Sequence, residues 1–174
     1  MNGNFQACLD EVLKLEGGWS DNPVDKGGPT NLGVTLETWR IWIGVNKVVT
    51  AADIKALTET DVAPLYQTVF WKGCAGDYLP KGADLATFDW CVNSGVRRGN
   101  VGLQEALGVG QDGLVGPVTL QKAAAMDPKA LVNSICDKRA EFYKSLPEAE
   151  QEEFLRGWLS RVEAVRGVAL GMVG

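Results

Sequence analysis

Residues 16–35 read EGGWSDNPVDKGGPTNLGVT, and this stretch is the most informative part of the chain. It contains five glycines, two prolines and two asparagines, a composition that predicts a loop or a short hairpin region and not a helix. The residues before this stretch repeat apolar side chains with the spacing of a helix, and further helix-like segments follow it. We therefore expect one helix, a glycine-rich loop with a small β element, and then a mainly helical remainder.

The segment before the loop places an acid where its pattern calls for an apolar side chain. The apolar face of the predicted helix consists of Phe5, Cys8, Leu9, Val12 and Leu13. The next position on that face is Glu16, and Gly17–Gly18 then ends the helix. Desolvation and the negative end of the helix dipole both favour a carboxyl group that keeps its proton. Such a group is suited to donate a proton to a leaving group, although a terminal Glu that simply turns into solvent is the alternative.

The loop carries a second carboxyl group and a hydroxyl. Asp25 lies nine residues after Glu16, and Thr30 lies five residues after Asp25. The glycines at 27, 28 and 33 allow tight turns that would bring Asp25 opposite Glu16. Two carboxyl groups across a cleft are the equipment for cleaving a glycosidic bond, and a nearby hydroxyl can help to hold the water. Ordinary turn residues are the alternative reading of Asp25 and Thr30.

The same stretch closely resembles the signature EGGY-x-N-x-P-x-D-x-GG-x-T-x-x-G-[IV]-T of the family 108 glycoside hydrolases. These are N-acetylmuramidases found among phage endolysins and bacterial secretion activator proteins. The resemblance continues along nearly the whole chain, through VFWKGCAGDYLP at 69–80, ATFDWCVNSGVRRG at 86–99, LQEALGVGQDGLVGPVTL at 103–120 and FLRGWLSRV at 154–162. The third of these segments also resembles general peptidoglycan-binding modules.

The resemblance implies site residues by position. Glu16 corresponds to the catalytic acid of the EGG motif, and likeness to phage-type lysozymes makes Asp25 the second carboxylate. Thr30 would be the water-positioning hydroxyl, with Thr35 a second candidate because the spacing from Asp25 to Thr30 is one residue shorter than usual. Substrate contacts are expected from the loop and from the helix that ends near residue 94: Trp19, Asn22, Asn31, Thr35 and Asn93.

The predicted fold class is mainly α, an α+β lysozyme-like fold with a small β-hairpin or loop region after the first helix. Residues 1–95 would form the lysozyme-like catalytic region, and residues 96–174 a peptidoglycan-binding-like helical region packed against it. Helices are expected over residues 4–16, 36–44, 59–72, 83–94, 99–108, 116–126, 128–146 and 148–170, and a further helix is expected to start at Ala51. Thr35, Thr50 and Thr58 are predicted N-caps.

Composition excludes several classes of site. Histidine is absent, which rules out Ser-His-Asp and Cys-His centres and the common histidine-containing zinc sites. The four cysteines, at 8, 74, 91 and 136, form no CxxC motif, and Cys8 and Cys91 are most simply buried free thiols. We therefore expect no cofactor and no metal.

Charge and hydropathy limit the partners. The net charge of −5 argues against nucleic acid, and no apolar stretch is long enough to predict stable membrane insertion. The N-terminus lacks the basic and apolar segments of a signal peptide. The expectation is therefore synthesis in the cytoplasm, release by a holin or export machinery, and action as a monomer on peptidoglycan in the periplasm or cell wall.

Two other functions stay open at this stage. One is a non-catalytic peptidoglycan-binding protein that uses the segment at 103–120. The other is a lytic transglycosylase, which needs only one acid and yields 1,6-anhydro products.

Overall fold

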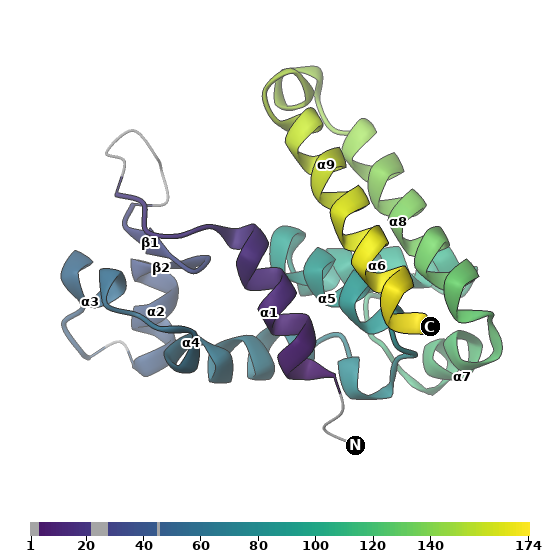
Figure 1. Ribbon diagram of the computed structural model, residues 1–174, viewed down its shortest axis with the longest axis horizontal. Helices are drawn as coiled ribbons and strands as arrows, with labels where there is room; N and C mark the ends of the chain where they lie inside the picture. The colour runs from purple at the N-terminus through teal and green to yellow at the C-terminus, as the bar shows by residue number, and fades with distance from the viewer. Residues whose placement is uncertain (1–3, 22–27, 45) are drawn as a thin grey trace. The chain divides into compact units, whose positions relative to one another are not determined.

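The computed structural model describes residues 4–21, 28–44 and 46–174. The chain forms two compact units, which we call the smaller unit (Leu9–Thr68) and the larger unit (Met1–Cys8 with Val69–Gly174). The described residues are mainly helical, with one two-stranded sheet, as the sequence predicted (Figure 1). In this division residues 69–95 cluster with the C-terminal helices, whereas the sequence assigned them to a catalytic region over 1–95. That assignment stays a prediction.

Helix α1 (Phe5–Glu16) covers the predicted range almost residue for residue. The residues of its apolar face, Cys8, Leu9, Val12 and Leu13, are all buried, which explains why the segment folds as an amphipathic helix. Gly17 follows with a φ of +78°, a left-handed conformation that suits glycine and ends the helix directly after Glu16.

A short antiparallel hairpin supplies the β element. Strand β1 (Thr30–Asn31) pairs with β2 (Val34–Thr35), so that Thr30 lies opposite Thr35 and Asn31 opposite Val34. Ser20 adds an isolated bridge to Thr30. The hairpin leads directly into α2 (Leu36–Ile43), and the Thr35 hydroxyl accepts a hydrogen bond from the Thr38 amide at 3.2 Å. The predicted N-cap at Thr35 is therefore confirmed.

The other helices of the smaller unit begin at reciprocal capping boxes. Thr50 and Asp53 cap α3 (Ala51–Lys55), and Thr58 and Asp61 cap α4 (Glu59–Tyr66). In each box the carboxylate accepts a hydrogen bond from the threonine amide at 2.8 Å. The chain stays helical to Trp71, close to the predicted end near residue 72, but the last five residues (Gln67–Trp71) form a π-helix after α4.

The core of the larger unit surrounds α5 (Ala83–Ser94), which is buried along most of its length. Helix α5 contacts α6 (Val96–Leu107), α8 (Pro128–Lys144) and α9 (Glu148–Val173), and α8 and α9 lie side by side (Figure 1). Helix α7 (Pro117–Ala125) and a 3-10 turn (Gly76–Tyr78) complete the unit. Helix α6 begins three residues earlier than predicted, directly after Gly95. A side chain at Gly102 would overlap the Trp90 ring, so this glycine permits the close packing of α5 and α6.

All four cysteines are buried free thiols, as the sequence indicated for Cys8 and Cys91. A hydrogen bond with Cys74, together with burial, raises the pKa of Cys91 well above its usual value. Burial raises the pKa of Cys136 to about 11.

One buried carboxylate connects three helices of the larger unit. Asp89 of α5 accepts a hydrogen bond from Nη1 of Arg139 at 2.6 Å and one from Nη2 of Arg161 at 2.7 Å. Burial by itself raises the pKa of Asp89, but the charges and hydrogen bonds of Arg139 and Arg161 outweigh it, so the pKa lies below its usual range. The ion pairs hold α8 and α9 against α5.

Replacement of Asp89 by Asn should strongly destabilise the chain, by about 3–5 kcal/mol, because a buried guanidinium loses its counter-charge. The loss of stability is measured as the difference in the free energy of unfolding in urea between the wild type and the variant. Because the pKa of Asp89 is depressed in the folded state, its contribution is present above the pKa of the unfolded state and is lost as the pH falls. The wild-type stability should therefore fall more steeply than that of the variant between neutral and acidic pH.

The matched control is Asp137→Asn, which removes the exposed partner of Arg166, an ion pair of 2.8 Å with a carboxylate side chain that is 63% exposed. This control should cost no more than about 1 kcal/mol. Equal losses in the two variants would contradict a special role for the buried ion pairs.

Candidate functional site

Glu16 is the last residue of α1, and its side chain is half-buried. The helix places it at the C-terminal end of the apolar face, and Gly17 then turns the chain away. The carboxyl group therefore lies at a fixed point of the smaller unit, where the backbone leaves regular structure.

The turn of the hairpin has an unusual backbone. Leu32 and Gly33, between β1 and β2, have φ values of 50° and 72°. Two positive φ values in succession are typical of a type I′ turn, which matches the twist of a hairpin, but they are unfavourable for leucine. The hydroxyl group of Tyr66 donates a hydrogen bond to the Leu32 carbonyl oxygen at 2.9 Å. Tyr66 belongs to α4 and is only 1% exposed, so its ring is held in place, and its hydrogen bond stabilises the strained turn.

The same turn contacts the candidate acid. A Cβ atom added to Gly33 would lie 2.8 Å from Oε2 of Glu16 and 2.5 Å from the hydroxyl oxygen of Tyr66. The backbone of Gly33 is therefore packed directly against the Glu16 carboxyl group and the Tyr66 hydroxyl group. The structure confirms that the chain folds back onto the end of the helix, and it adds Tyr66, which the sequence did not indicate.

Thr30 occupies the first position of β1 and is half-buried. Its backbone exchanges two hydrogen bonds of 2.8 Å with Ser20, and its hydroxyl group donates to the Gly28 carbonyl oxygen at 3.1 Å. Since the hydroxyl proton is engaged, the oxygen is available as an acceptor for a water or a substrate hydroxyl.

Two predicted substrate residues have structural roles. Asn31 is 7% exposed, and its amide nitrogen donates to the carbonyl oxygens of Ile54, Lys55 and Leu57 at 3.1–3.2 Å, which secures the end of α3 on β1. Thr35 is the N-cap of α2. A substrate contact of either residue stays a prediction, and its side chain is already used within the fold.

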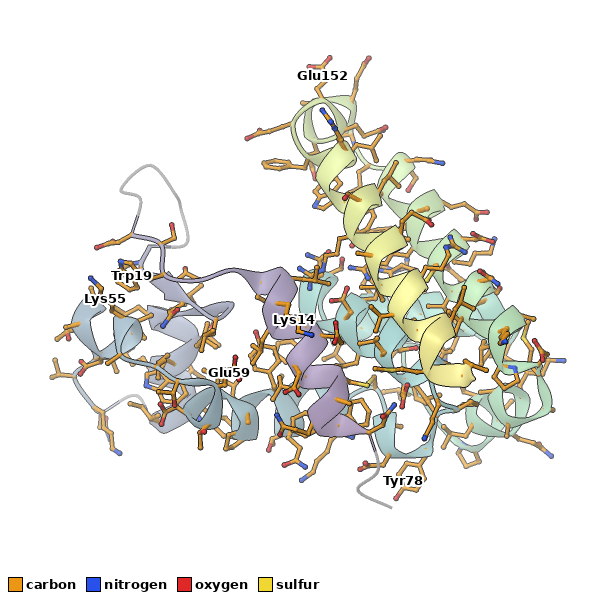
Figure 2. The ribbon with its side chains drawn as sticks, viewed as in Figure 1. Lys14, Trp19, Lys55, Glu59, Tyr78 and Glu152 are labelled. Carbon is orange, nitrogen blue, oxygen red and sulfur yellow. The ribbon has the colours of Figure 1, made fainter. Side chains whose placement is uncertain are left out.

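Trp19 lies three residues after Glu16, and the ammonium group of Lys55 is 5.7 Å from the centre of its ring (Figure 2). This pair offers an aromatic face for stacking on a sugar ring and a cation for a carboxylate. Lys55 was not indicated by the sequence, because only the folded chain brings it to the loop.

Asn93 belongs to the larger unit, near the end of α5. Its amide oxygen accepts hydrogen bonds from Nη2 of Arg139 at 3.3 Å and from the Tyr143 hydroxyl group. The residue is thus part of the buried network around Asp89. Its predicted contact with substrate stays a prediction. So do the substrate contact of Asn22 and the catalytic role of Asp25, two residues that lie outside the described part of the chain.

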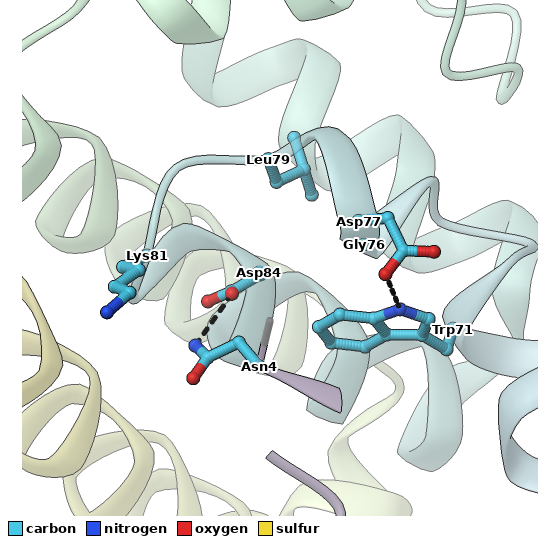
Figure 3. A pocket seen from close by; sticks show the side chains of 7 residues that line it. All are labelled: Asn4, Trp71, Gly76, Asp77, Leu79, Lys81 and Asp84. Carbon is cyan, nitrogen blue, oxygen red and sulfur yellow. Dashed lines mark hydrogen bonds between the residues drawn. The ribbon is translucent and has the colours of Figure 1, made fainter. Parts of the chain in front are cut away.

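A small cavity in the larger unit contains the buried carboxyl group of Asp84 (Figure 3). Burial raises the pKa of Asp84, while a 2.8 Å hydrogen bond from Asn4 opposes the rise. The neighbouring Asp77 accepts a 3.0 Å hydrogen bond from the indole of Trp71. With a volume of about 130 Å³ the cavity is smaller than the roughly 300 Å³ typical of ligand sites, so it suits water better than a sugar.

Within residues 4–21, 28–44 and 46–174, no three His, Cys, Asp or Glu side chains gather in an arrangement that would bind a metal ion. In the same part of the chain, no helix has the length and apolar character needed to cross a membrane.

The contact at Gly33 can be tested by adding one methyl group. Gly33→Ala should cost more stability than the roughly 1–2 kcal/mol expected from a positive φ alone, because the new atom meets Glu16 and Tyr66. Gly108→Ala is the matched control: its φ is +66°, and no described atom lies within 4 Å of the added Cβ. Urea unfolding of the two variants gives the comparison, and equal losses would show that the Gly33 contact is unimportant for stability.

Two family models match successive parts of the chain. The model of the family described as Glycosyl hydrolase 108 matches residues 9–95, which include Glu16, and that of a family described as Predicted Peptidoglycan domain matches residues 98–163. A solved structure titled "Structure of Brucella abortus SagA" is 39% identical, with a TM-score of 0.86 over 99% of this chain and 97% of that chain. No curated protein matches. At this identity over the full length, the chain belongs to the glycosyl hydrolase 108 family.

Proposed function

We propose that this chain is an N-acetylmuramidase that hydrolyses the β-1,4 bond between N-acetylmuramic acid and N-acetylglucosamine in peptidoglycan. The observation that carries the proposal is the position of Glu16, a half-buried acid at the end of α1, packed against the hairpin turn. Family membership supports a glycoside hydrolase, and the peptidoglycan domain at 98–163 supports peptidoglycan as the polymer.

In the proposed reaction, Glu16 donates its proton to the glycosidic oxygen as the bond to the anomeric carbon breaks. Asp25 removes a proton from a water that attacks this carbon from the opposite face, which inverts the configuration. The Thr30 oxygen accepts a hydrogen bond from that water, since its own proton is donated to Gly28. The Trp19 ring stacks on a sugar, and Lys55 binds a carboxylate of the substrate.

Tyr66 is proposed as a positioning residue. Its hydroxyl group holds the Leu32 carbonyl oxygen and limits the space beside Glu16, so that the carboxyl group keeps one orientation. A fixed proton donor needs no reorganisation at the moment of bond cleavage.

Replacement of Glu16 by Gln removes the proton donor with little change in shape. We expect the rate at which purified sacculi lose turbidity to fall by about 10²–10⁴-fold, the usual contribution of general acid catalysis. The matched control is Glu11→Gln on the same helix, which breaks a surface ion pair with Lys14. Circular dichroism confirms that both variants fold, and equal clearing by both would remove Glu16 from the mechanism.

Product analysis separates hydrolysis from lytic transglycosylation, the alternative that needs one acid. Hydrolysis by the proposed mechanism yields reducing N-acetylmuramic acid in the α configuration, and Asp25→Asn should reduce the rate by about 10²-fold or more. Mass spectrometry of the muropeptides and anomer-resolved NMR are the measurements. Anhydro products, together with normal activity of Asp25→Asn, would contradict the hydrolytic mechanism.

Binding without cleavage is the second candidate function. A groove in the larger unit, at the segment shared with peptidoglycan-binding modules, favours it. The two candidates differ in a simple observation: a binding protein pellets with sacculi but leaves their turbidity unchanged.

The biological setting is also a proposal. Resemblance to endolysins and secretion activator proteins supports a phage or prophage endolysin that acts as a monomer. Such an enzyme would be made in the cytoplasm and reach the periplasm or cell wall through a holin or export machinery.

A further inference from the structure

A groove of about 350 Å³ lies between the C-terminal end of α6 and the start of α7 in the larger unit. Its volume is within the range of small-molecule sites and exceeds that of the cavity at Asp84. Gln104 of α6 lies in its wall, together with residues of the loop that follows α6 and with Pro117, Val118 and Thr119 of α7. The proposed catalytic residues all belong to other segments of the chain.

The loop is fixed by side-chain amides from α6. The side chain of Gln104 donates to Oδ1 of Asp112 at 2.7 Å and to the Leu114 carbonyl oxygen at 3.1 Å, and it accepts from the Gly113 amide at 2.8 Å. Asn100, one helical turn earlier, donates to the Gly113 carbonyl oxygen at 3.0 Å. These hydrogen bonds fix the loop that forms the groove.

Two large aliphatic side chains remain exposed on this rigid frame. Leu114 is 72% exposed and Val118 is 70% exposed, and both line the groove. Since neither side chain is buried against the fold, both can make apolar contact with a bound group in the groove.

The groove has one charged lining residue among those described, Asp112. Hydrogen bonds from the Gln104 side chain and the Leu114 amide lower its pKa, so it carries a negative charge at neutral pH. Both bonds end on Oδ1, and neither uses the second carboxylate oxygen. A cationic group is the electrostatic complement of this site.

We propose that the groove binds the stem peptide of peptidoglycan, with alanine methyl groups against Leu114 and Val118 and the ammonium group of the diamino acid at Asp112. The peptide fits better than the glycan, because none of the described residues that line the groove has an aromatic ring to stack on sugars. The inference rests on the proposed function, in that it takes peptidoglycan as the polymer. It assigns recognition of the stem to residues outside the catalytic loop.

The site also predicts a preference among stems. Cross-linking converts the side-chain amine of the diamino acid into an uncharged amide, which removes the partner of Asp112. Stems that are not cross-linked should therefore bind better than cross-linked ones.

The test measures retention on purified sacculi of the Glu16→Gln protein, so that the polymer stays intact. In this background, Leu114→Ser combined with Val118→Ser should weaken binding by about tenfold, the effect of losing roughly 1.4 kcal/mol of apolar contact. Asp112→Asn keeps an oxygen acceptor for Gln104 and removes the charge, and it should weaken binding several-fold. Val48→Ser, at a side chain that is 91% exposed in the smaller unit, is the matched control and should bind as the parent does.

Two changes to the sacculi identify the group recognised. Chemical acetylation of the free amines should weaken the parent to the level of Asp112→Asn and leave that variant unaffected. Removal of the stems with an amidase should abolish the difference between the groove variants and the control. Equal binding by all variants, or undiminished binding to stripped glycan strands, would overturn the proposal. Clearing by the wild-type protein is a separate measurement, so failure of the hydrolase proposal is distinguishable from failure of this one.

Discussion

The smaller unit depends on a close backbone contact at Gly33, where there is no room for a side chain. Gly33 brings the hairpin turn against the Glu16 carboxyl group and the Tyr66 hydroxyl group, and any larger residue would occupy the same space. The turn is strained at Leu32, and Tyr66 compensates through a hydrogen bond to the carbonyl oxygen of that residue. Local strain held by surrounding structure is a common feature of functional sites. Here it joins the end of α1, the hairpin and α4 at the acid proposed for catalysis.

Amide side chains perform one task in both units, which is to satisfy backbone groups that helices and strands leave unpaired. Asn31 donates to three carbonyl oxygens at the end of α3, and Asn100 and Gln104 do the same for the loop before α7. Since a buried polar backbone group costs free energy when it lacks a partner, these amides fix loops that have little apolar contact of their own. Of these residues, Asn31 was predicted from the sequence as a substrate contact, because the sequence alone does not show the carbonyl oxygens that its amide binds.

What the sequence predicted well was local. The apolar face of α1 and the capping boxes at Thr50 and Thr58 involve residues within four positions of each other, so spacing alone reveals them. The π turns after α4 and the early start of α6 are not encoded by a residue pattern of that kind. The sequence did not indicate Tyr66 or Lys55, because the residues that they contact lie more than 30 positions away in the chain. Asn93 likewise finds its partners, Arg139 and Tyr143, on a distant helix. The roles of Glu16 and Asp25 came from motif spacing and stay predictions.

The buried thiols have a consequence for the proposed release of the chain from the cytoplasm to the periplasm or cell wall, since these compartments differ in redox potential. Disulfide exchange and oxidation proceed through the thiolate, and the raised pKa values of Cys91 and Cys136 keep that form scarce near neutral pH. Burial of all four sulfur atoms also keeps oxidants away from them. The folded chain therefore depends on no covalent cross-link in a reducing environment and resists acquiring one in an oxidising environment, so its covalent structure is the same on either side of a membrane.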